Sequence, residues 1–400
     1  MSQESKQPPQ TPPHALETSA VHGPHPGKLG AVSTPIVRSA TFSFASLASL
    51  NAAQAAGAGG FYYQRTGHPT IRAVEEHLAL LEGAEGALLF PSGMGAISSV
   101  FLSILRSGDH VVCVDPCYGG TQDLLQFGRD RMGWEISYVD ARKPEAFAAA
   151  FRPHTRLFHL ETPINPTLAV FDIAEAAALG HQRGAVVTLD NTIASPVGQR
   201  PLAMGCDLVM YSATKSLAGH SDVLAGVAAG SWKHLTPVNN VRVKFGSNAD
   251  PEMAWLLERS LKTLPLRVRA ANANALELAL RLQQHRCVAQ VFYPGLPTHP
   301  NHAIAVKQMH NGFGPLLGFE VRGGADDAVR VVEAFRLIHH AVSLGGVESL
   351  ASLAAHSSHK MIGLEGRKRA GIPEGLIRLS AGIENVEDLW ADLAQALERL

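Results

Sequence analysis

Apolar segments of strand length alternate with helical segments from Phe61 to Ser247, and this alternation constrains the fold of the 400-residue chain more than any other feature. One unit of the alternation has an apolar run at 109–115, a helical stretch at 119–131 and a second apolar run at 134–139. Strands that alternate with helices predict an α/β fold with a largely parallel sheet flanked by helices. Because ligands of such sheets bind at the carboxyl ends of the strands, we expect a functional site at that edge.

The chain is predicted to have three parts. A long helical pattern at 251–285 precedes short strand signals at 318–321 and 377–379, which indicates a second, smaller α/β domain. Met1–Pro13 is polar and rich in proline and cannot bury enough apolar surface to order itself. Segment 27–60 is expected to be an extended arm that crosses to a partner subunit, with an alanine and glycine loop at 52–60. The resulting division is a flexible tail and N-terminal arm at 1–60, a large domain at 61–250 and a small domain at 251–400.

Charge, hydropathy and residue counts argue against several classes of partner. The 34 basic and 35 acidic residues nearly cancel, so the chain provides no field for nucleic acid or an anionic membrane. No apolar run approaches membrane-spanning length, and no apolar segment follows a basic start, so we expect neither a membrane span nor a secretory signal. Four cysteines without a CxxC pair favour a reducing cytoplasm. The 19 histidines include no HExxH motif or Cys/His cluster, so no metal centre is expected.

One lysine, Lys215, stands among hydroxyl and small residues directly after an apolar run. An aldehyde cofactor needs an amine that loses its proton near neutral pH, which partial desolvation provides, and hydroxyl donors nearby to hold a phosphate. Ser212 and Thr214 can supply those donors. An isolated lysine in such a segment is more often a solvated loop residue, so its assignment depends on the rest of the chain.

An acid, Asp190, ends the apolar strand pattern that begins at Ala185. A carboxylate at the end of a strand can face a ligand and keep a pyridine nitrogen protonated, which makes the ring a strong electron sink. Taken alone, Asp190 could equally cap a helix. A second apolar strand separates Asp190 from Lys215, and this arrangement suits a ring held between two adjacent strand ends.

A strand-to-helix turn at Pro91–Gly95 is a candidate phosphate site. Free N–H groups at a helix start bind phosphate, and glycines allow close approach, so Ser92, Gly93 and Met94 are the expected cradle. A purely structural turn is the alternative. The segment matches neither the Walker loop nor the GxGxxG spacing, so nucleotide binding is not expected.

Eight motifs together carry a resemblance to a known family. They are Tyr63–Thr70, Pro91–Gly95, Tyr118–Thr121, Glu161–Thr167, Leu189–Asn191, Ser212–Lys215, Ser343–Gly346 and Ile377–Ser380. In content and order they resemble the Cys/Met metabolism enzymes that depend on pyridoxal phosphate: cystathionine lyases and synthases, methionine γ-lyase and O-acylhomoserine sulfhydrylases. The resemblance implies a fold-type I, aspartate-aminotransferase-like fold. It also implies a homo-oligomer, a dimer or tetramer, with active sites shared between subunits.

The resemblance also implies roles in cofactor binding. Lys215 is expected to hold pyridoxal 5'-phosphate as a Schiff base and to move protons, while Asp190 pairs with the pyridine nitrogen. The family's phosphate cup corresponds to the backbone of Gly93 and Met94 with the hydroxyls of Ser212 and Thr214. Tyr118 resembles the tyrosine that stacks on the ring, and its hydroxyl is expected to lie close to the reacting carbons and to take part in catalysis. Tyr63 and Arg65 are expected to complete the cup of the neighbouring subunit, for which a guanidinium fork is well suited.

Further family positions concern the substrate. Arg378 is expected to bind the substrate α-carboxylate, with Asn165 assisting, which orients the bond to be broken. Ser343 would line the site near the lysine. Val342 stands where cystathionine γ-synthases and γ-lyases usually carry glutamate, and this argues against a site for a distal ammonium group. Gly120 differs from the cysteine that methionine γ-lyases carry at that position.

We therefore predict a pyridoxal-phosphate-dependent C–S lyase that acts by α,β- or α,γ-elimination on cystathionine, methionine or a related substrate. The alternative within the family is a γ-replacement enzyme of the O-acylhomoserine sulfhydrylase or cystathionine γ-synthase type. The alternative from another class is a non-catalytic oligomer that binds the cofactor.

Overall fold

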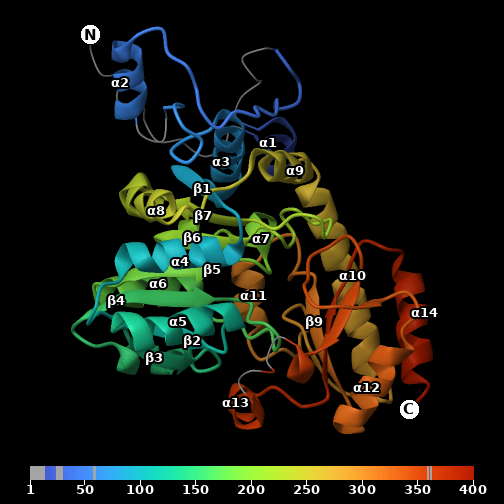
Figure 1. The fold of residues 1–400 in the computed structure, drawn as a ribbon. Coiled ribbons are helices and arrows are strands. Elements are labelled where there is room, and N and C mark those ends of the chain that lie inside the picture. Colours follow the sequence, from blue (N-terminus) through green and yellow to red (C-terminus); the bar gives the residue numbers. More distant parts are fainter. Residues whose placement is uncertain (1–13, 24–29, 57–59, 358–359, 361–362) are drawn as a thin grey trace.

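The computed structural model describes residues 14–23, 30–56, 60–357, 360 and 363–400. The predicted tail at Met1–Pro13, residues 24–29 around the start of the predicted arm, and residues 57–59 within the arm lie outside these residues. A large α/β domain, with helices around a central sheet, lies beside a smaller domain that contains the C-terminus (Figure 1). The α/β architecture with one larger and one smaller domain is as predicted from the sequence.

The helices and strands alternate along most of the chain. The α-helices are α1 Leu16–His22, α2 Leu47–Ala55, α3 Pro69–Glu82, α4 Gly93–Ile104, α5 Gly119–Met132, α6 Ile173–Gln182, α7 Ser195–Gly198, α8 Trp232–Phe245, α9 Pro251–Leu261, α10 Leu264–Gln284, α11 His302–Gln308, α12 Gly324–Ala334, α13 Gly363–Ala370 and α14 Val386–Leu397. The strands are β1 Gly86–Phe90, β2 His110–Asp115, β3 Glu135–Asp140, β4 Thr155–Glu161, β5 Val186–Asp190, β6 Leu208–Ser212, β7 Gly226–Gly230, β8 Val288–Phe292, β9 Leu316–Val321, β10 His339–His340, β11 Leu350–Leu353 and β12 Leu376–Ser380.

The large domain contains a seven-stranded sheet with the order β1-β7-β6-β5-β4-β2-β3. Its pairs from β6 to β3 are parallel, so the strands β4, β5 and β6 end side by side at one edge. β7 runs antiparallel to both of its neighbours, β1 and β6. The sequence did not indicate this strand, because its residues Gly-Val-Ala-Ala-Gly include few of the β-branched and aromatic residues that favour strands.

The large sheet is buried on both faces, because side chains along a strand point alternately to opposite faces. In β1, Leu88 and Phe90 belong to a core cluster that includes residues of α4, α5 and α6. Ala87 and Leu89, on the other face, belong to a cluster with residues of α3 and α9. This double burial explains why these strands appear in the sequence as continuous apolar runs.

The small domain contains a five-stranded sheet with the order β10-β11-β12-β9-β8. The predicted strands at 318–321 and 377–379 correspond to β9 and β12, which pair antiparallel in the centre of this sheet. The helical pattern at 251–285 forms two helices, α9 and α10, separated at 262–263. Because α9 packs on α3 of the large domain, the division of the chain at residue 250 stays a prediction.

The N-terminal segment contains more helix than the sequence analysis expected. The predicted alanine and glycine loop at 52–60 is wrong for residues 52–55, which belong to α2. Ser46 and Ser49 form a capping box at the start of α2, and alanine has the highest helix propensity. α1 packs against α3, where His77 Nε2 lies 3.0 Å from the carbonyl oxygen of Ser19.

No helix in the described part of the chain has the length and apolar character needed to cross a membrane.

Candidate active site

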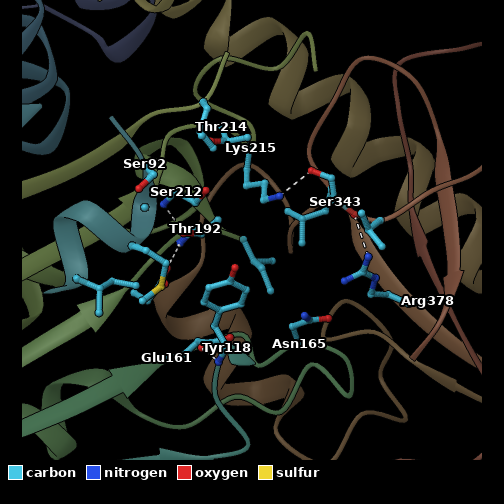
Figure 2. A pocket seen from close by; sticks show the side chains of 18 of the residues that line it. Ser92, Tyr118, Glu161, Asn165, Thr192, Ser212, Thr214, Lys215, Ser343 and Arg378 are labelled. Atoms are coloured by element: carbon cyan, nitrogen blue, oxygen red, sulfur yellow. Dashed lines mark hydrogen bonds between the residues drawn. The ribbon is translucent and has the colours of Figure 1, made fainter. Parts of the chain in front are cut away.

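A cavity of about 600 Å³ lies at the carboxyl ends of β4, β5 and β6 and is closed on one side by residues of the small domain. Figure 2 shows side chains from both domains pointing into it. The sequence-predicted residues that line it are Ser92, Gly93, Met94, Tyr118, Asn165, Asp190, Ser212, Thr214, Lys215, Val342, Ser343 and Arg378. Residues that the sequence analysis did not select include Glu161, Thr192 and Leu224.

Lys215 lies in the turn that follows β6, and its side chain extends toward the small domain. Its Nζ donates a hydrogen bond of 2.6 Å to Ser343 Oγ. Partial burial, and next the positive charge of Arg378, lower the pKa of Lys215 to about 8. A larger fraction of this amine is therefore neutral near physiological pH than of an ordinary lysine.

Asp190 ends β5, and Glu161 ends the neighbouring parallel strand β4 in register with it. Both carboxyl groups are buried, at 7% and 6% residual exposure. Burial raises the pKa of Asp190, although two hydrogen bonds from Thr192 oppose this effect. Burial, followed by the charge of Asp190, raises the pKa of Glu161 to about 8. The pair therefore favours one ionised carboxylate, which we assign to Asp190 because of its hydrogen bonds from Thr192.

Tyr118 is the N-cap residue of α5 and has no side-chain capping bond. Its backbone N–H donates a 2.7 Å hydrogen bond to Glu161 Oε2, which fixes the start of the helix. The ring lies over Gly120, since a Cβ built on Gly120 would lie 2.6 Å from Tyr118 Cε1. Burial, and then the charges of Asp190 and Glu161, raise the pKa of the Tyr118 hydroxyl.

The N-terminus of α4 forms a cradle of backbone N–H groups. Ser92 caps the helix by accepting a 3.0 Å hydrogen bond from Gly95 N, and the first N–H groups of a helix lack helical acceptors. A Cβ on Gly226 of β7 would lie 2.0 Å from the Ser92 carbonyl oxygen, so only glycine fits beside this turn. Ser212 also lies beside this turn, because a Cβ on Gly93 would lie 3.0 Å from Ser212 Cβ.

Two polar residues are buried on the opposite side of the cavity. Arg378 of β12 is 5% exposed, and its Nη2 donates a 3.0 Å hydrogen bond to the carbonyl oxygen of Ser343. Burial lowers the pKa of Arg378 to about 10, well above neutrality, so the guanidinium stays charged. The Oδ1 atom of Asn165 is buried and has no hydrogen-bond partner among the described residues. Both groups can therefore bind a ligand.

Tyr63 and Arg65 do not line this cavity in the same chain. The Arg65 guanidinium lies 5.6 Å from the centre of the Tyr63 ring, and Arg65 Nη1 donates a 3.2 Å hydrogen bond to the carbonyl oxygen of Val243. Both side chains are exposed and line a separate surface depression. Their predicted role in a neighbouring subunit stays a prediction.

The residues of the cavity fit pyridoxal phosphate. The amine with a lowered pKa is suited to an aldehyde, and the helix N-terminus to a phosphate. Asp190 is buried and forms no ion pair within the described part of the chain, so a protonated ring nitrogen would supply the cation that it lacks. In the part of the chain that the structure describes, no group of three or more His, Cys, Asp or Glu side chains could hold a metal ion. The fold and the cavity together define a fold-type I enzyme that uses pyridoxal phosphate.

Comparisons with known proteins agree with this class. The family model of the Cys/Met metabolism PLP-dependent enzymes matches residues 17–398. L-methionine gamma-lyase of Porphyromonas gingivalis is 40% identical over 387 residues, which cover 96% of this chain and 97% of that protein. Cystathionine beta-lyase MetC of Bacillus subtilis is 41% identical over 389 residues, which cover 96% of this chain and 97% of that protein.

Solved structures are similar over nearly the whole chain. The structure of metB from Corynebacterium glutamicum has a TM-score of 0.92 at 36% identity and covers 98% of this chain and 99% of that chain. Cystathionine gamma-lyase from Lactobacillus plantarum, complexed with L-serine, has a TM-score of 0.90 at 37% identity, with 96% and 99% covered. The chain belongs to the Cys/Met metabolism family of PLP-dependent enzymes. The resemblance, the fold type and the cofactor predicted from the sequence are thereby confirmed.

Proposed function

We propose that the chain is a pyridoxal-phosphate-dependent C–S lyase, which releases a thiol, ammonia and a 2-oxo acid from methionine, cystathionine or a related amino acid. The observation that carries the proposal is the Lys215 amine, with its pKa lowered to about 8, in the same cavity as the buried Asp190 carboxylate. The names of similar proteins support it, because they are methionine gamma-lyases and cystathionine beta- and gamma-lyases.

The residues that would hold the cofactor lie on the large-domain side of the cavity. When bound, pyridoxal phosphate supplies an electron sink for negative charge at the substrate Cα. We assign to Asp190 the task of keeping a proton on the pyridine nitrogen, and to Tyr118 that of covering one face of the ring. The phosphate is assigned to four residues that line one end of the cavity: Gly93 and Met94 through their N–H groups, and Ser212 and Thr214 through their hydroxyls.

The substrate is assigned to the opposite side. Arg378 and Asn165 would donate hydrogen bonds to its α-carboxylate, Arg378 through two parallel N–H groups and Asn165 through its Nδ2 group. The neutral amine of Lys215 would then take the proton from the substrate Cα, and Ser343 Oγ would keep Nζ oriented for this transfer. Loss of this proton prepares the substrate for departure of its sulfur group.

The outer wall of the cavity favours an uncharged substrate side chain. Val342 and Leu224 are 68% and 64% exposed and both line the cavity. An ammonium group at the end of a cystathionine side chain would find no carboxylate in these two residues, whereas the methyl thioether of methionine would contact apolar carbon. A γ-replacement enzyme such as an O-acylhomoserine sulfhydrylase remains the second candidate, since the same wall suits an uncharged acyl ester.

We further propose that the protein acts in the cytoplasm as a homo-oligomer, a dimer or tetramer, in which Tyr63 and Arg65 complete the phosphate site of a neighbouring subunit. Two observations support this assignment. Both side chains are exposed, and neither lines the cavity of its own chain.

A substrate panel tests the proposed reaction. Purified protein loaded with pyridoxal phosphate is incubated with L-methionine, with L-cystathionine, and with O-acetylhomoserine plus sulfide. Release of 2-oxobutyrate from methionine at the highest kcat/KM is the expected result. Sulfide-dependent formation of homocysteine as the dominant reaction would instead identify the γ-replacement enzyme, and no turnover of any substrate would identify a non-catalytic oligomer.

A further inference from the structure

Arg267, in the first turn of α10, occupies an unfavourable position for a positive charge. It is 8% exposed, and burial lowers its pKa to about 10. It forms no ion pair with a carboxylate of the described residues. The N-terminus of a helix also carries a partial positive charge, which repels a cation. A guanidinium under these conditions needs strong hydrogen-bond acceptors.

Two of the four acceptors of Arg267 belong to the turn that contains the reactive lysine. A third is the hydroxyl oxygen of Thr263, the N-cap residue of α10, which accepts a 3.1 Å hydrogen bond from Arg267 Nε. Its Nη1 donates a 2.8 Å hydrogen bond to the carbonyl oxygen of Ser216, and its Nη2 donates one of 3.3 Å to that of Leu217. Nη2 also donates a 2.8 Å hydrogen bond to the carbonyl oxygen of Ser260 at the end of α9. One side chain thus connects the two residues after Lys215 to the helices that join the domains.

The rest of this turn is closed by backbone contacts. Gly219 N donates a 2.8 Å hydrogen bond to the carbonyl oxygen of Lys215, and Val347 N of the small domain donates one of 2.9 Å to that of Gly219. The carbonyl groups of Ser216 and Leu217 receive no hydrogen bond from the described backbone. Gly219 also makes room for the guanidinium, since a Cβ there would lie 1.8 Å from Arg267 Nη1.

We propose that Arg267 is a positioning residue of the active site, which fixes the turn at 215–219 so that the Lys215 amine points into the cavity. This role rests on the proposed function, because it concerns the lysine that would bind the cofactor. Loss of the two guanidinium contacts would release the carbonyl groups of Ser216 and Leu217 to water. The lysine side chain would then become more hydrated and less well directed.

The test compares Arg267→Met with the native full-length protein and with Arg269→Met. Methionine keeps much of the side-chain volume but removes all five donors. Arg269 is two positions further along α10, is 41% exposed and pairs with Glu17 at the surface, so its variant is a matched control. For each protein, the affinity for pyridoxal phosphate and the pH midpoint of the visible band of the bound cofactor are measured by absorbance.

The affinity of Arg267→Met for pyridoxal phosphate is expected to fall about tenfold. The pH midpoint of the visible band is expected to change by about one unit, which is also a factor of ten in a proton equilibrium. Other charged or titratable groups that line the cavity around Lys215 are Tyr118, Glu161, Asp190 and Arg378, and all four are unchanged in both variants. Arg269→Met is expected to match the native protein in both measurements. An Arg267→Met variant with native affinity and midpoint, even at a lower Tm, overturns the proposal.

Gly219→Ala provides a second variant that retains the charge of Arg267 but displaces its Nη1, and the φ of 70° at this position adds backbone strain in the same turn. This variant is expected to bind pyridoxal phosphate more weakly and to shift the pH midpoint of the visible band in the same direction as Arg267→Met. It serves as the test of the proposal if Arg267→Met does not fold. Native behaviour of Gly219→Ala overturns the proposal. If the native protein itself gives no visible band and borohydride attaches no pyridoxyl group to Lys215, the proposed function fails instead.

Discussion

Lys215 and Ser343 are 128 positions apart in the sequence, yet their side chains are joined by a 2.6 Å hydrogen bond across the two domains. Arg378 Nη2 binds the carbonyl oxygen of the same serine, so Ser343 lies between the two cationic groups of the cavity. Ser343 has a φ of 90°, which is unusual for a residue other than glycine. Such strain persists only where surrounding contacts hold it, and here the Lys215 and Arg378 side chains both bind this residue.

Lys215→Ala removes the amine that we assign to cofactor binding and proton transfer. Turnover of every substrate in the panel is expected to fall by at least about a thousandfold, the scale of losing a group that acts both as the covalent anchor and as the base. Borohydride reduction followed by peptide mass mapping should find a pyridoxyl group on Lys215 in the native protein. Wild-type rates in the variant, or an adduct on another lysine, would contradict the assignment.

Arg378 is predicted to act both on the substrate and on the pKa of Lys215. Arg378→Ala should raise KM strongly and lower kcat, because the substrate is then bound weakly and misoriented. Loss of the positive charge should also raise the pKa of Lys215 above about 8, so pyridoxal phosphate should be incorporated efficiently only at higher pH. The pH dependence of the incorporation rate measures this effect.

Arg378→Lys separates the two effects. It keeps a positive charge but loses the planar pair of donors, so KM should rise while the pH profile of incorporation stays near that of the native protein. If Arg378→Ala has native KM and a native profile, Arg378 does not belong to the substrate site.

Glu161→Gln is expected to make the cofactor-free protein more stable than the native protein, by an amount that grows as the pH rises. The folded pKa of about 8 lies above the ordinary value of 4.5, so between these values the folded native protein keeps a proton that the unfolded chain has lost. The free energy of unfolding of the native protein therefore falls as the pH rises through this window. The variant has no carboxyl group at position 161, so its free energy of unfolding lacks this pH dependence. Chemical denaturation at several pH values should show that the free energies of unfolding of the variant and the native protein differ increasingly from pH 4.5 to 8, by on the order of a few kcal/mol at pH 8. A difference independent of pH would show that Glu161 is ionised in the folded state.

Mixed oligomers test the shared site. Lys215→Ala and Arg65→Ala chains are each expected to be inactive or weakly active, but hetero-oligomers of the two contain some sites with both native residues. Mixing should therefore restore part of the activity, up to about a quarter of the native value, because about half of randomly mixed dimers are heterodimers and each heterodimer has one intact site of its two. The composition of the mixed species is verified by native mass spectrometry. Verified hetero-oligomers without restored activity would show that Arg65 acts within its own chain or not at all.

The sequence predicted best those features that depend on a single segment. Apolar runs that end at Asp190 and at Met210 indicate the carboxyl ends of β5 and β6, and adjacent parallel strands bring these ends together. Glu161 lies in the motif Glu161–Thr167 and ends the apolar strand β4 in the same way that Asp190 ends β5. The same signal could have identified it.

Other features depend on tertiary contacts that no local pattern contains. Arg267 follows an ordinary helix start, and its importance appears only when Ser216 and Leu217 lie opposite its guanidinium. The small residues of α2 are also common in loops, whereas the pair Ser46 and Ser49 is a capping signal that marks the start of this helix. The apolar wall of the cavity is likewise formed by residues of different domains, Leu224 from the large domain and Val342 from the small domain.

Gly226 has a consequence for the interpretation of genetic variants of this enzyme. It carries no functional group, yet even one added methyl would overlap the backbone that starts α4. In a saturation library selected for growth on the reaction product, position 226 should therefore be as depleted of substitutions as position 215. Intolerance to substitution alone would not distinguish the residue that performs chemistry from the one that only leaves space for it.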